Sequence, residues 1–423
     1  MKVLLLNQCF YPDVVSTAQH LTDLAVGLSE RGHEVTVVCG SRGYDNPEVR
    51  FPARETWKGI EIIRIPTLGL GKRAKWRRAA DFASFLFFCA CRLAVLPRQD
   101  ATVALTSPPL ISFFGALFVR LKGGRFYFWV MDLNPDEAIA AGWLKESSLA
   151  SKFFQLLLHY SLRHARKVFV LDRFMKRRVL AKGIAENRVE VIAPWSHDDA
   201  IRYDAEGRRA FRDENGLSHK FVVMYSGNHS PCHPLDTLLA AADALRARED
   251  IAFCFVGGGS EQQKVKRFAE ARGISNIVCL PYQPMGDLSA SLSAADMHAV
   301  VMGDPFLGIV HPCKIYNILA LGTPILYVGP AESHVTDIVS GMSDGYARCA
   351  RHGSGDEVVE HILACAASPR SQSSDALRAA SDFSLGRLLP RMLEIIESSG
   401  SKFSRESSAA AESGNSLDLA RPL

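Results

Sequence analysis

The sequence predicts an α/β protein built from two Rossmann-like domains whose parallel sheets face each other across a cleft. Each half of the chain alternates short apolar runs with amphipathic helical segments, and a charged stretch at residues 198–220 separates the halves. The length of 423 residues also suits two domains better than one. We expect the domains at residues 1–200 and 201–397, with the last helix free to pack back on the first domain, and a disordered Ser/Ala/Gly-rich tail at 398–423.

The first half opens with a strand–helix–strand unit. Val3–Leu6 and Val35–Cys39 are continuous apolar runs, the pattern of strands covered on both faces. Between them a helix is expected to begin at Ser16 and to end at Arg31-Gly32. So short a βαβ unit implies a parallel sheet. Five further runs predict the remaining strands: Ile60–Ile65, Ala101–Leu105, Phe126–Val130, Val168–Leu171 and Val189–Ile192.

The second half repeats this organisation. Strands are expected at Phe221–Tyr225, Ile251–Val256, Ile277–Leu280, Met297–Val301 and Pro324–Val328. Helices are expected at Pro234–Arg248, Gln262–Arg272, Asp287–Ala294 and Cys313–Leu321. Ligands bind to open α/β sheets at the carboxyl ends of the strands, so the two domains should share a ligand-binding cleft.

Composition narrows the class of protein. Hydrophobic residues make up 48% of the chain and the net charge is only +4, so we expect no nucleic-acid partner. The ten cysteines contain no C-x-x-C pair, which favours a reducing compartment. The apolar stretch after Met1 is too short for a signal peptide. We therefore expect a cytoplasmic protein.

A basic stretch precedes an apolar segment in the first half. The basic stretch comprises Lys72, Arg73, Lys75, Trp76, Arg77 and Arg78, and the apolar segment is Phe82–Val95. That segment is shorter than the roughly 20 residues that span a bilayer. The pattern favours peripheral contact with the anionic inner face of the cell membrane. A membrane-bound substrate, the acceptor, would then lie near the expected cleft. The alternative is a buried helix beside a solvated basic loop.

Glycine-rich turns at strand ends in the second half predict an anion-binding site. Gly303–Gly308 leads towards the helix that begins near Cys313, and Lys314 in its first turn adds a positive charge. Gly257–Gly259 allow a ligand to approach the backbone closely. Tyr282 and Gln283 suit contact with a nucleotide base. The alternatives are tight turns, a solvated lysine and a surface tyrosine.

Several motifs resemble those of retaining family-four glycosyltransferases of the GT-B fold. In the first half they are Tyr11-Pro12-Asp13 and the run Ser29–Val37, which reads S-E-R-G-H-E-V-T-V. In the second half they are Tyr225–Asn228, Val256–Gly259, Ala294–Asp296, His311–Tyr316 and Ala320–Ile325. The variant H-P-C-K-I-Y resembles members that build polysaccharides and lipid-linked glycans. The resemblance covers residues 1–397.

The resemblance implies a hexosyltransferase that moves a sugar from a nucleoside-diphosphate donor to a lipid-linked or glycan acceptor, with retention and without a metal or other cofactor. The residues assigned to donor binding are Gly227, Asn228, His229, Gly257, Gly258, Gly259, Tyr282, Gln283, Gly308, His311, Lys314 and Asn317. Two departures stand out. Ile309 and Asn317 occupy the positions of the family's glutamate pair, and His229 and His233 stand where Arg and Lys are usual.

Asp132 is the candidate catalytic residue. It follows a predicted strand in the run D-L-N-P-D, and similar runs in the family face the cleft. A carboxylate there can orient or deprotonate the acceptor hydroxyl. The alternative is a loop carboxylate that holds backbone N–H groups.

Other functions remain to be weighed. A nicotinamide-dependent oxidoreductase is disfavoured because the first βα loop, N-Q-C-F-Y, has no G-x-G-x-x-G. An epimerase acting on a nucleotide sugar needs cleft carboxylates that the donor loop lacks. The main alternative is a catalytically impaired scaffold of the same fold that binds a sugar or nucleotide.

Overall fold

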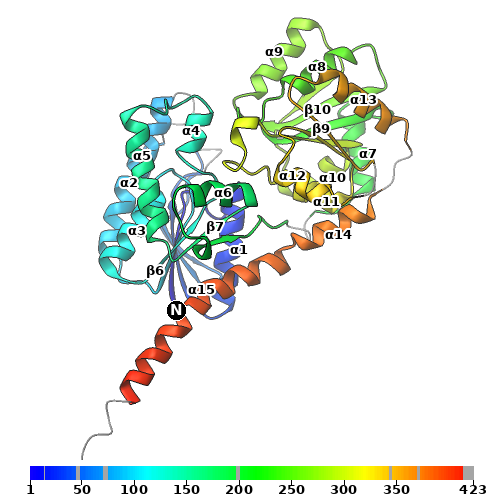
Figure 1. Ribbon diagram of the computed structural model, residues 1–423. Coiled ribbons are helices and arrows are strands. Elements are labelled where there is room, and N and C mark those ends of the chain that lie inside the picture. Colours follow the sequence, from blue (N-terminus) through cyan, green and yellow to red (C-terminus); the bar gives the residue numbers. More distant parts are fainter. Residues whose placement is uncertain are drawn as a thin grey trace, which may run out of the picture.

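The computed structural model describes residues 1–13, 15–43, 48–69, 75–196, 201–342, 345–368 and 372–412, with residues 75, 76, 78 and 399–412 described by their backbone alone. Two domains lie side by side, and each has a sheet between layers of helices (Figure 1). The predicted fold class is confirmed. Each sheet is buried on both faces, as the continuous apolar strands require.

The first domain is organised around an eight-stranded sheet of order β3-β4-β2-β1-β5-β6-β7-β8. Its strands are β1 (Lys2–Leu6), β2 (Glu34–Gly40), β3 (Arg54–Trp57), β4 (Ile60–Ile65), β5 (Ala101–Ala104), β6 (Arg125–Trp129), β7 (Lys167–Val170) and β8 (Val189–Val191). Only β3 runs antiparallel to its neighbour. The sequence prediction missed β3 because an edge strand reading R-E-T-W has no continuous apolar run.

The second domain has a six-stranded parallel sheet of order β11-β10-β9-β12-β13-β14. Its strands are β9 (Phe221–Asn228), β10 (Ile251–Gly258), β11 (Ile277–Leu280), β12 (Met297–Val301), β13 (Ile325–Val328) and β14 (Ala347–Ala350). β9 and β10 continue beyond their predicted ends into glycines, and Gly227 pairs with Gly257. The edge strand β14, which reads A-R-C-A, was not predicted.

Helices cover both sheets. Those of the first domain are α1 (Ser16–Glu30), α2 (Lys75–Val95), α3 (Ile111–Lys122), α4 (Asp136–Ala140), α5 (Leu149–His164) and α6 (Arg173–Ala181). The second domain has α7 (Ala205–Glu214), α8 (Asp236–Ala244), α9 (Gln262–Arg272), α10 (Leu288–Ser293), α11 (Lys314–Leu321), α12 (His334–Val339), α13 (Gly355–Ala366) and α14 (Ser374–Asp382). Short 3₁₀ turns lie at Glu186–Arg188, Met285–Asp287 and Asp304–Phe306.

The stretch predicted as a linker is largely part of the second domain. Residues 205–214 form α7, which packs on α10. Arg212 Nη2 lies 2.5 Å from Asp296 Oδ2, and Arg208 pairs with the other carboxylate oxygen. The high charge of this helix explains why the sequence predicted a linker. Two of its arginines, however, form ion pairs with a buried aspartate.

The last helix returns to the first domain. α15 (Leu385–Glu412) runs from the second domain along α1, where Leu389 and Leu393 pack against Gly27 (Figure 1). A tail disordered from residue 398 was expected, but the backbone stays helical to Glu412. Ala409–Ala411 are strong helix formers, which accounts for the difference. Residues 413–423 lie outside the described part of the chain.

The domains share apolar contacts at the cleft. Phe306, Ile309, Val310 and Cys232 of the second domain belong to the same buried cluster as the core of the first. Backbone groups also meet there, because Leu133 N donates to Ile309 O over 2.9 Å. The loop before α11 is therefore held against the loop after β6.

Candidate active site

Glycines lie at the carboxyl ends of β9 and β10, two neighbouring strands of the second domain. Gly227, Gly257 and Gly259 have φ values of +130°, +131° and +129°, which side-chain-bearing residues rarely adopt. A Cβ atom at Gly257 would collide with the carbonyl oxygen of Gly227, and one at Gly259 with that of His229. These three positions therefore require glycine, and they bring backbone atoms close together at the edge of the cleft.

Lys314 faces this glycine edge from the first turn of α11. Its Nζ is buried, and no hydrogen-bond acceptor contacts it in the described part of the chain. The ring of Tyr225 lies 3.4 Å away, measured from Nζ to the ring centroid, and a Cβ at Gly227 would lie 3.4 Å from Nζ. Burial lowers the pKa of Lys314 well below its ordinary value. An ammonium group buried in this way is suited to an anionic ligand.

Two predicted histidines flank the lysine. His229 is fully buried, and neither ring nitrogen has a partner within the described residues. Burial, followed by the charge of Lys314, lowers its pKa to about 4. His233 lies nearby with Nδ1 2.8 Å from Val301 O, and its pKa falls to about 3 for the same two reasons. Both imidazoles are therefore neutral at pH 7, so they do not replace the cations expected there.

Tyr282, Gln283 and Asn228 lie at the outer rim of this edge. The Tyr282 ring lies over Gly258, and its hydroxyl donates to Gly258 O over 3.4 Å. Tyr282 is 52% exposed, so much of its surface can still contact a ligand. The Gln283 amide donates to Pro281 O, and Asn228 is exposed at the end of β9. Asn317 lies one turn after Lys314 on α11, and it is partly exposed.

Gly308 and His311 face the first domain and not the glycine edge. A Cβ at Gly308 would lie 2.7 Å from the backbone of Phe174, so a domain contact explains this glycine. Both ring nitrogens of His311 are occupied, by Asp172 at 2.7 Å and by the Tyr316 hydroxyl at 2.6 Å. Their assignment to donor binding has no support in these contacts. The apolar Ile309 is also explained, because it is only 3% exposed between the domains.

Asp132 lies in the first domain, in the loop that follows β6. Its backbone N donates to Thr106 Oγ1, and the next residue bonds to the loop before α11. Burial, and then the charge of Glu137, raises the pKa of Asp132 well above that of an exposed aspartate. Asp132 and Lys314 lie near a contact between the domains, because Leu133 N, one residue after Asp132, donates to Ile309 O, five residues before Lys314.

Sequence reasoning missed Glu137 and Cys232, which complete this region. Glu137 Oε2 accepts from Asn134 Nδ2 over 2.9 Å, and Glu137 Oε1 lies 3.8 Å from Cys232 Sγ across the cleft. Burial and then the Glu137 carboxylate raise the pKa of the Cys232 thiol to about 12. Glu137 was detectable as the residue that follows D-L-N-P-D in the sequence.

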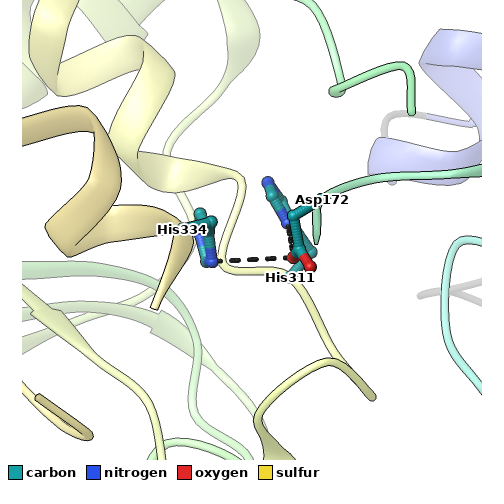
Figure 2. A group of neighbouring side chains, drawn as sticks. All are labelled: Asp172, His311 and His334. Atoms are coloured by element: carbon teal, nitrogen blue, oxygen red, sulfur yellow. Dashed lines mark hydrogen bonds and ion pairs between the residues drawn. The ribbon is translucent and has the colours of Figure 1, made fainter. Parts of the chain in front are cut away.

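A buried cluster of Asp172, His311 and His334 also joins the domains (Figure 2). These residue types can bind a metal, but the two imidazole rings stack with centroids 3.7 Å apart and planes at 24°. A metal lies in the plane of each imidazole that binds it, and two nearly parallel stacked rings cannot direct their nitrogens at one ion. The cluster as arranged is a hydrogen-bonded contact.

The basic stretch is only partly described. Lys72 and Arg73 lie outside the described residues, and Lys75, Trp76 and Arg78 are placed by their backbone in the first turn of α2. Arg77 is exposed. Further along α2, Phe85 and Cys89 are fully buried, whereas Phe87 is 63% and Phe88 40% exposed. One face of α2 is thus buried in the first domain, and another face is exposed.

Comparison with family models identifies both domains. Residues 17–195 match the glycosyl transferase 4-like domain, and residues 207–342 match the glycosyl transferases group 1 domain. Together the two matches span most of the chain. They follow the boundary between the two sheets.

Curated proteins and solved structures agree with this result. The chain is 25% identical over 380 residues to a putative colanic acid biosynthesis glycosyl transferase, WcaI of Escherichia coli K12, covering 86% of this chain and 91% of that protein. It is 22% identical to the probable glycosyltransferase WbjE of Pseudomonas aeruginosa, covering 74% and 76%. Anabaena HepE, solved with UDP and glucose, matches with a TM-score of 0.71 at 15% identity over 94% of this chain and all of that chain. WaaG, a glycosyltransferase involved in lipopolysaccharide biosynthesis, matches with a TM-score of 0.68 at 16% identity over 93% and 99%.

Proposed function

Because this chain belongs to the GT-B glycosyltransferases, we propose that it transfers a hexose from a nucleoside-diphosphate donor to a lipid-linked or polysaccharide acceptor, with retention of configuration. One observation above all supports this proposal: the described residues offer no hydrogen-bond acceptor to the buried Nζ of Lys314, which faces Gly227 at the glycine-rich ends of β9 and β10. A diphosphate supplies the missing negative charge. The glycines allow it to approach the backbone.

The second domain binds the donor in this proposal. Lys314, in the first turn of α11, contacts the diphosphate, where the helix dipole adds to its positive charge. His229, buried beside Lys314, donates a hydrogen bond from its neutral ring. Tyr282 stacks on the base. Lys314 and the helix terminus supply the positive charge needed when the bond between sugar and diphosphate breaks, so we propose that no metal is needed.

The first domain orients the acceptor. As the sugar–phosphate bond breaks, its electron pair stays on the diphosphate, the acceptor oxygen bonds to the anomeric carbon, and the hydroxyl proton is released. Asp132 and Glu137 are the carboxyl groups that line this side of the cleft. In this proposal Asp132 holds the acceptor hydroxyl, and the ionised member of the pair receives its proton.

The names of the relatives favour a polysaccharide or lipopolysaccharide pathway. WcaI is named for colanic acid and WaaG for lipopolysaccharide, and HepE was solved with UDP and with UDP-glucose. We therefore include uridine-diphosphate sugars among the first donors to test. The acceptor class rests on these names and on the membrane-facing surface described next.

A surface formed by α2, α3 and α5 supports cytoplasmic, peripheral membrane binding. The three helices lie side by side on one flank of the first domain (Figure 1). Their exposed large apolar residues are Phe87, Phe88, Val95, Leu121, Leu149, Phe153 and Leu156. Their charged residues with described side chains are Arg77, Arg92, Arg120, Lys122, Lys152 and Arg163, against the single acid Asp81. Apolar and basic residues on one flank favour an anionic lipid surface.

No helix in the described ranges is long and apolar enough to cross a bilayer. The three-helix surface would instead lie on the lipid headgroups, with the apolar side chains inserted between them. Because α3 follows the carboxyl end of β5, one end of this surface lies at the sheet edge that also carries Asp132, which follows β6. A lipid-linked acceptor would therefore reach Asp132 from the membrane.

Binding of donor candidates tests the proposal. Purified protein is heated with UDP-, GDP-, ADP- and dTDP-sugars, and a donor that binds only the folded state raises Tm. Turnover is then measured with the donor that is selected. The proposal predicts a Tm rise in the unaltered chain and none in Lys314→Ala, while Lys264→Ala, which alters an exposed lysine paired with Asp236, behaves as the unaltered chain does. A Tm rise that survives in Lys314→Ala contradicts the placement of the donor.

The second candidate function is a scaffold that binds a nucleotide sugar without transferring it. It is favoured by Ile309 and Asn317, which replace the usual carboxylates. Donor binding without hydrolysis or transfer to any membrane lipid extract would support the scaffold. Transfer that is lost in Asp132→Ala would exclude it.

A further inference from the structure

Asp172 extends from the first domain into the second. It follows β7 and caps α6, where its Oδ1 accepts from Met175 N over 2.7 Å. Its Oδ2 lies 2.7 Å from Nδ1 of His311, a residue 139 positions away on the other domain. Asp172 and His311 are both buried (Figure 2). One carboxylate therefore links the start of α6 to the loop before α11.

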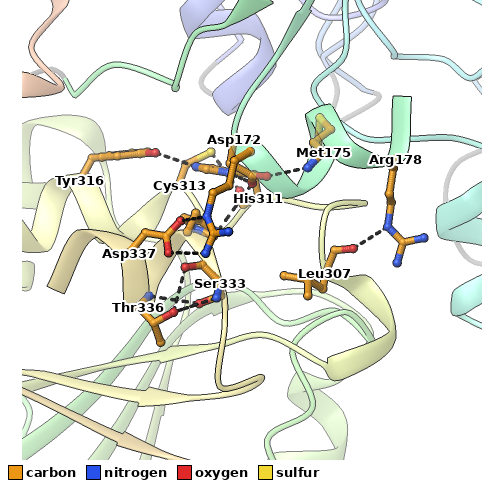
Figure 3. A network of polar contacts seen from close by, with 12 residues as sticks. Asp172, Met175, Arg178, Leu307, His311, Cys313, Tyr316, Ser333, Thr336 and Asp337 are labelled. Carbon is orange, nitrogen blue, oxygen red and sulfur yellow. Dashed lines mark hydrogen bonds and ion pairs between the residues drawn. The ribbon is translucent and has the colours of Figure 1, made fainter. Parts of the chain in front are cut away.

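His311 also contacts α11, the helix that carries Lys314. Its Nε2 lies 2.6 Å from the hydroxyl of Tyr316, which is 2% exposed, and its carbonyl oxygen accepts from Cys313 Sγ (Figure 3). Lys314 lies between His311 and Tyr316 in the sequence, so these contacts hold the chain on both sides of the lysine. His334 stacks on the His311 ring and restricts its rotation.

The contact is specific to one arrangement of the domains. Burial by itself would raise the pKa of Asp172, but the hydrogen bond and charge of His311, followed by the charge of His334, lower it to about 2. The carboxylate is thus ionised at neutral pH, and separation of the domains would leave His311 without its acceptor. A buried polar contact of this kind restricts the number of acceptable geometries more than it adds stability.

We propose that Asp172 is a positioning residue for the donor site, because its hydrogen bond to His311 makes the placement of Lys314 depend on contact between the two domains. This inference rests on the proposed donor role of Lys314. It assigns a function to His311 other than the direct donor contact that the sequence suggested. Asp172 itself does not touch the donor.

A neighbouring ion pair provides a matched control. Arg173, the next residue in the chain, makes a two-pronged contact with Asp337 of the second domain at 2.6 and 2.9 Å. This pair also joins the domains, but both side chains are well exposed and neither contacts His311. Arg173→Ala therefore removes an interdomain contact and leaves the link to Lys314 intact.

The experiment measures the Kd of whichever of UDP, GDP, ADP or dTDP raises Tm of the unaltered chain, together with KM for the corresponding sugar donor and kcat. We expect Asp172→Ala and Tyr316→Phe to weaken nucleotide binding and raise KM about tenfold, Asp172→Asn to recover part of the loss because it keeps an acceptor, and Arg173→Ala to stay within about twofold. Tyr316→Phe tests the same link from its far end if Asp172→Ala fails to fold.

The outcomes separate this inference from the proposed function. If Lys314→Ala abolishes nucleotide binding while the folded Asp172 and Tyr316 variants bind normally, the positioning role is overturned and the donor site stands. An equal loss in Arg173→Ala also overturns it, because any domain contact would then suffice. If the unaltered chain binds none of the four nucleotides, the proposed function fails first.

Discussion

Lys314→Met separates stability from binding, because the described residues of the ligand-free protein offer no hydrogen-bond acceptor to the buried Lys314 amino group. Replacing this group relieves its desolvation cost, the same cost that lowers the pKa of Lys314, which is several kcal/mol. It also removes the cation–π contact with Tyr225, at 3.4 Å from Nζ to the ring centroid, which contributes about 2 kcal/mol in a desolvated site. Methionine has a similar length and leaves no large cavity. We therefore expect the ligand-free variant to gain about 1–3 kcal/mol.

The gain should appear in the melting temperature of the ligand-free protein. For a domain of about 200 residues, 1 kcal/mol corresponds to about 2–4 °C, so Tm should rise by about 2–12 °C. The same variant should lose nucleoside-diphosphate binding by about 100-fold or more in calorimetry, as expected for a removed charged contact. Lys264→Met, at an exposed lysine, should change stability by no more than about 0.5 kcal/mol. A variant that is destabilised and still binds nucleotide would refute the reasoning.

Three further predictions concern pH, backbone and membrane. Burial depresses the pKa of His229 and His298 to about 4 each, so their unfolded forms take up protons below pH 6.5 while the folded forms do not. The free energy of unfolding should therefore fall by about 1.6 kcal/mol per histidine between pH 6.5 and pH 5, and His298→Gln should show a smaller fall in urea titrations. Stability that is unchanged or higher at pH 5 would contradict the neutral burial of these rings. Gly257→Ala should cost at least about 2 kcal/mol and weaken donor binding, whereas Gly286→Ala, where a Cβ meets no atom within 4 Å, should cost less than about 0.5 kcal/mol. Equal unfolding midpoints for Gly257→Ala and Gly286→Ala would show that the ends of β9 and β10 can shift to accept a side chain, which would contradict the requirement for glycine at position 257. The double variant Phe87→Ser, Phe153→Ser should no longer float with phosphatidylglycerol vesicles, and salt should weaken vesicle binding by the unaltered chain. The control is Leu377→Ser, at an exposed leucine of α14. Flotation of the double variant would exclude the three-helix surface as the membrane-binding site.

The candidate site was predictable where it depends on strand order. Glycines, Lys314 and Asp132 all follow predicted strands or begin a predicted helix, and parallel strands bring their carboxyl ends to one edge. The roles of Gly308 and His311 were predicted differently from what the structure shows. Both lie in the same loop as the donor residues, and only their side-chain environment reveals that they face Phe174 and Asp172.

The three-helix surface shows a second limit of the sequence. The apolar run Phe82–Val95 was visible, but its partners Leu149, Phe153 and Leu156 lie some 60 residues later and resemble any amphipathic helix. Their exposed faces become one surface only when α3 is placed beside both α2 and α5. Periodicity identifies an apolar face without indicating whether another element covers it.

The sequence by itself determined the two βα series, because a strand buried on both faces must be apolar at every position; the predicted bounds of Ile60–Ile65, Ile277–Leu280 and Met297–Val301 are those observed. It also determined the residues of the glycine edge. Only the tertiary structure decided that Lys314 has no hydrogen-bond acceptor among the described residues and that Asp172 of the first domain contacts His311 of the second. Both depend on contacts between residues far apart in the chain, and burial of a charge is a property of its surroundings that no local pattern encodes.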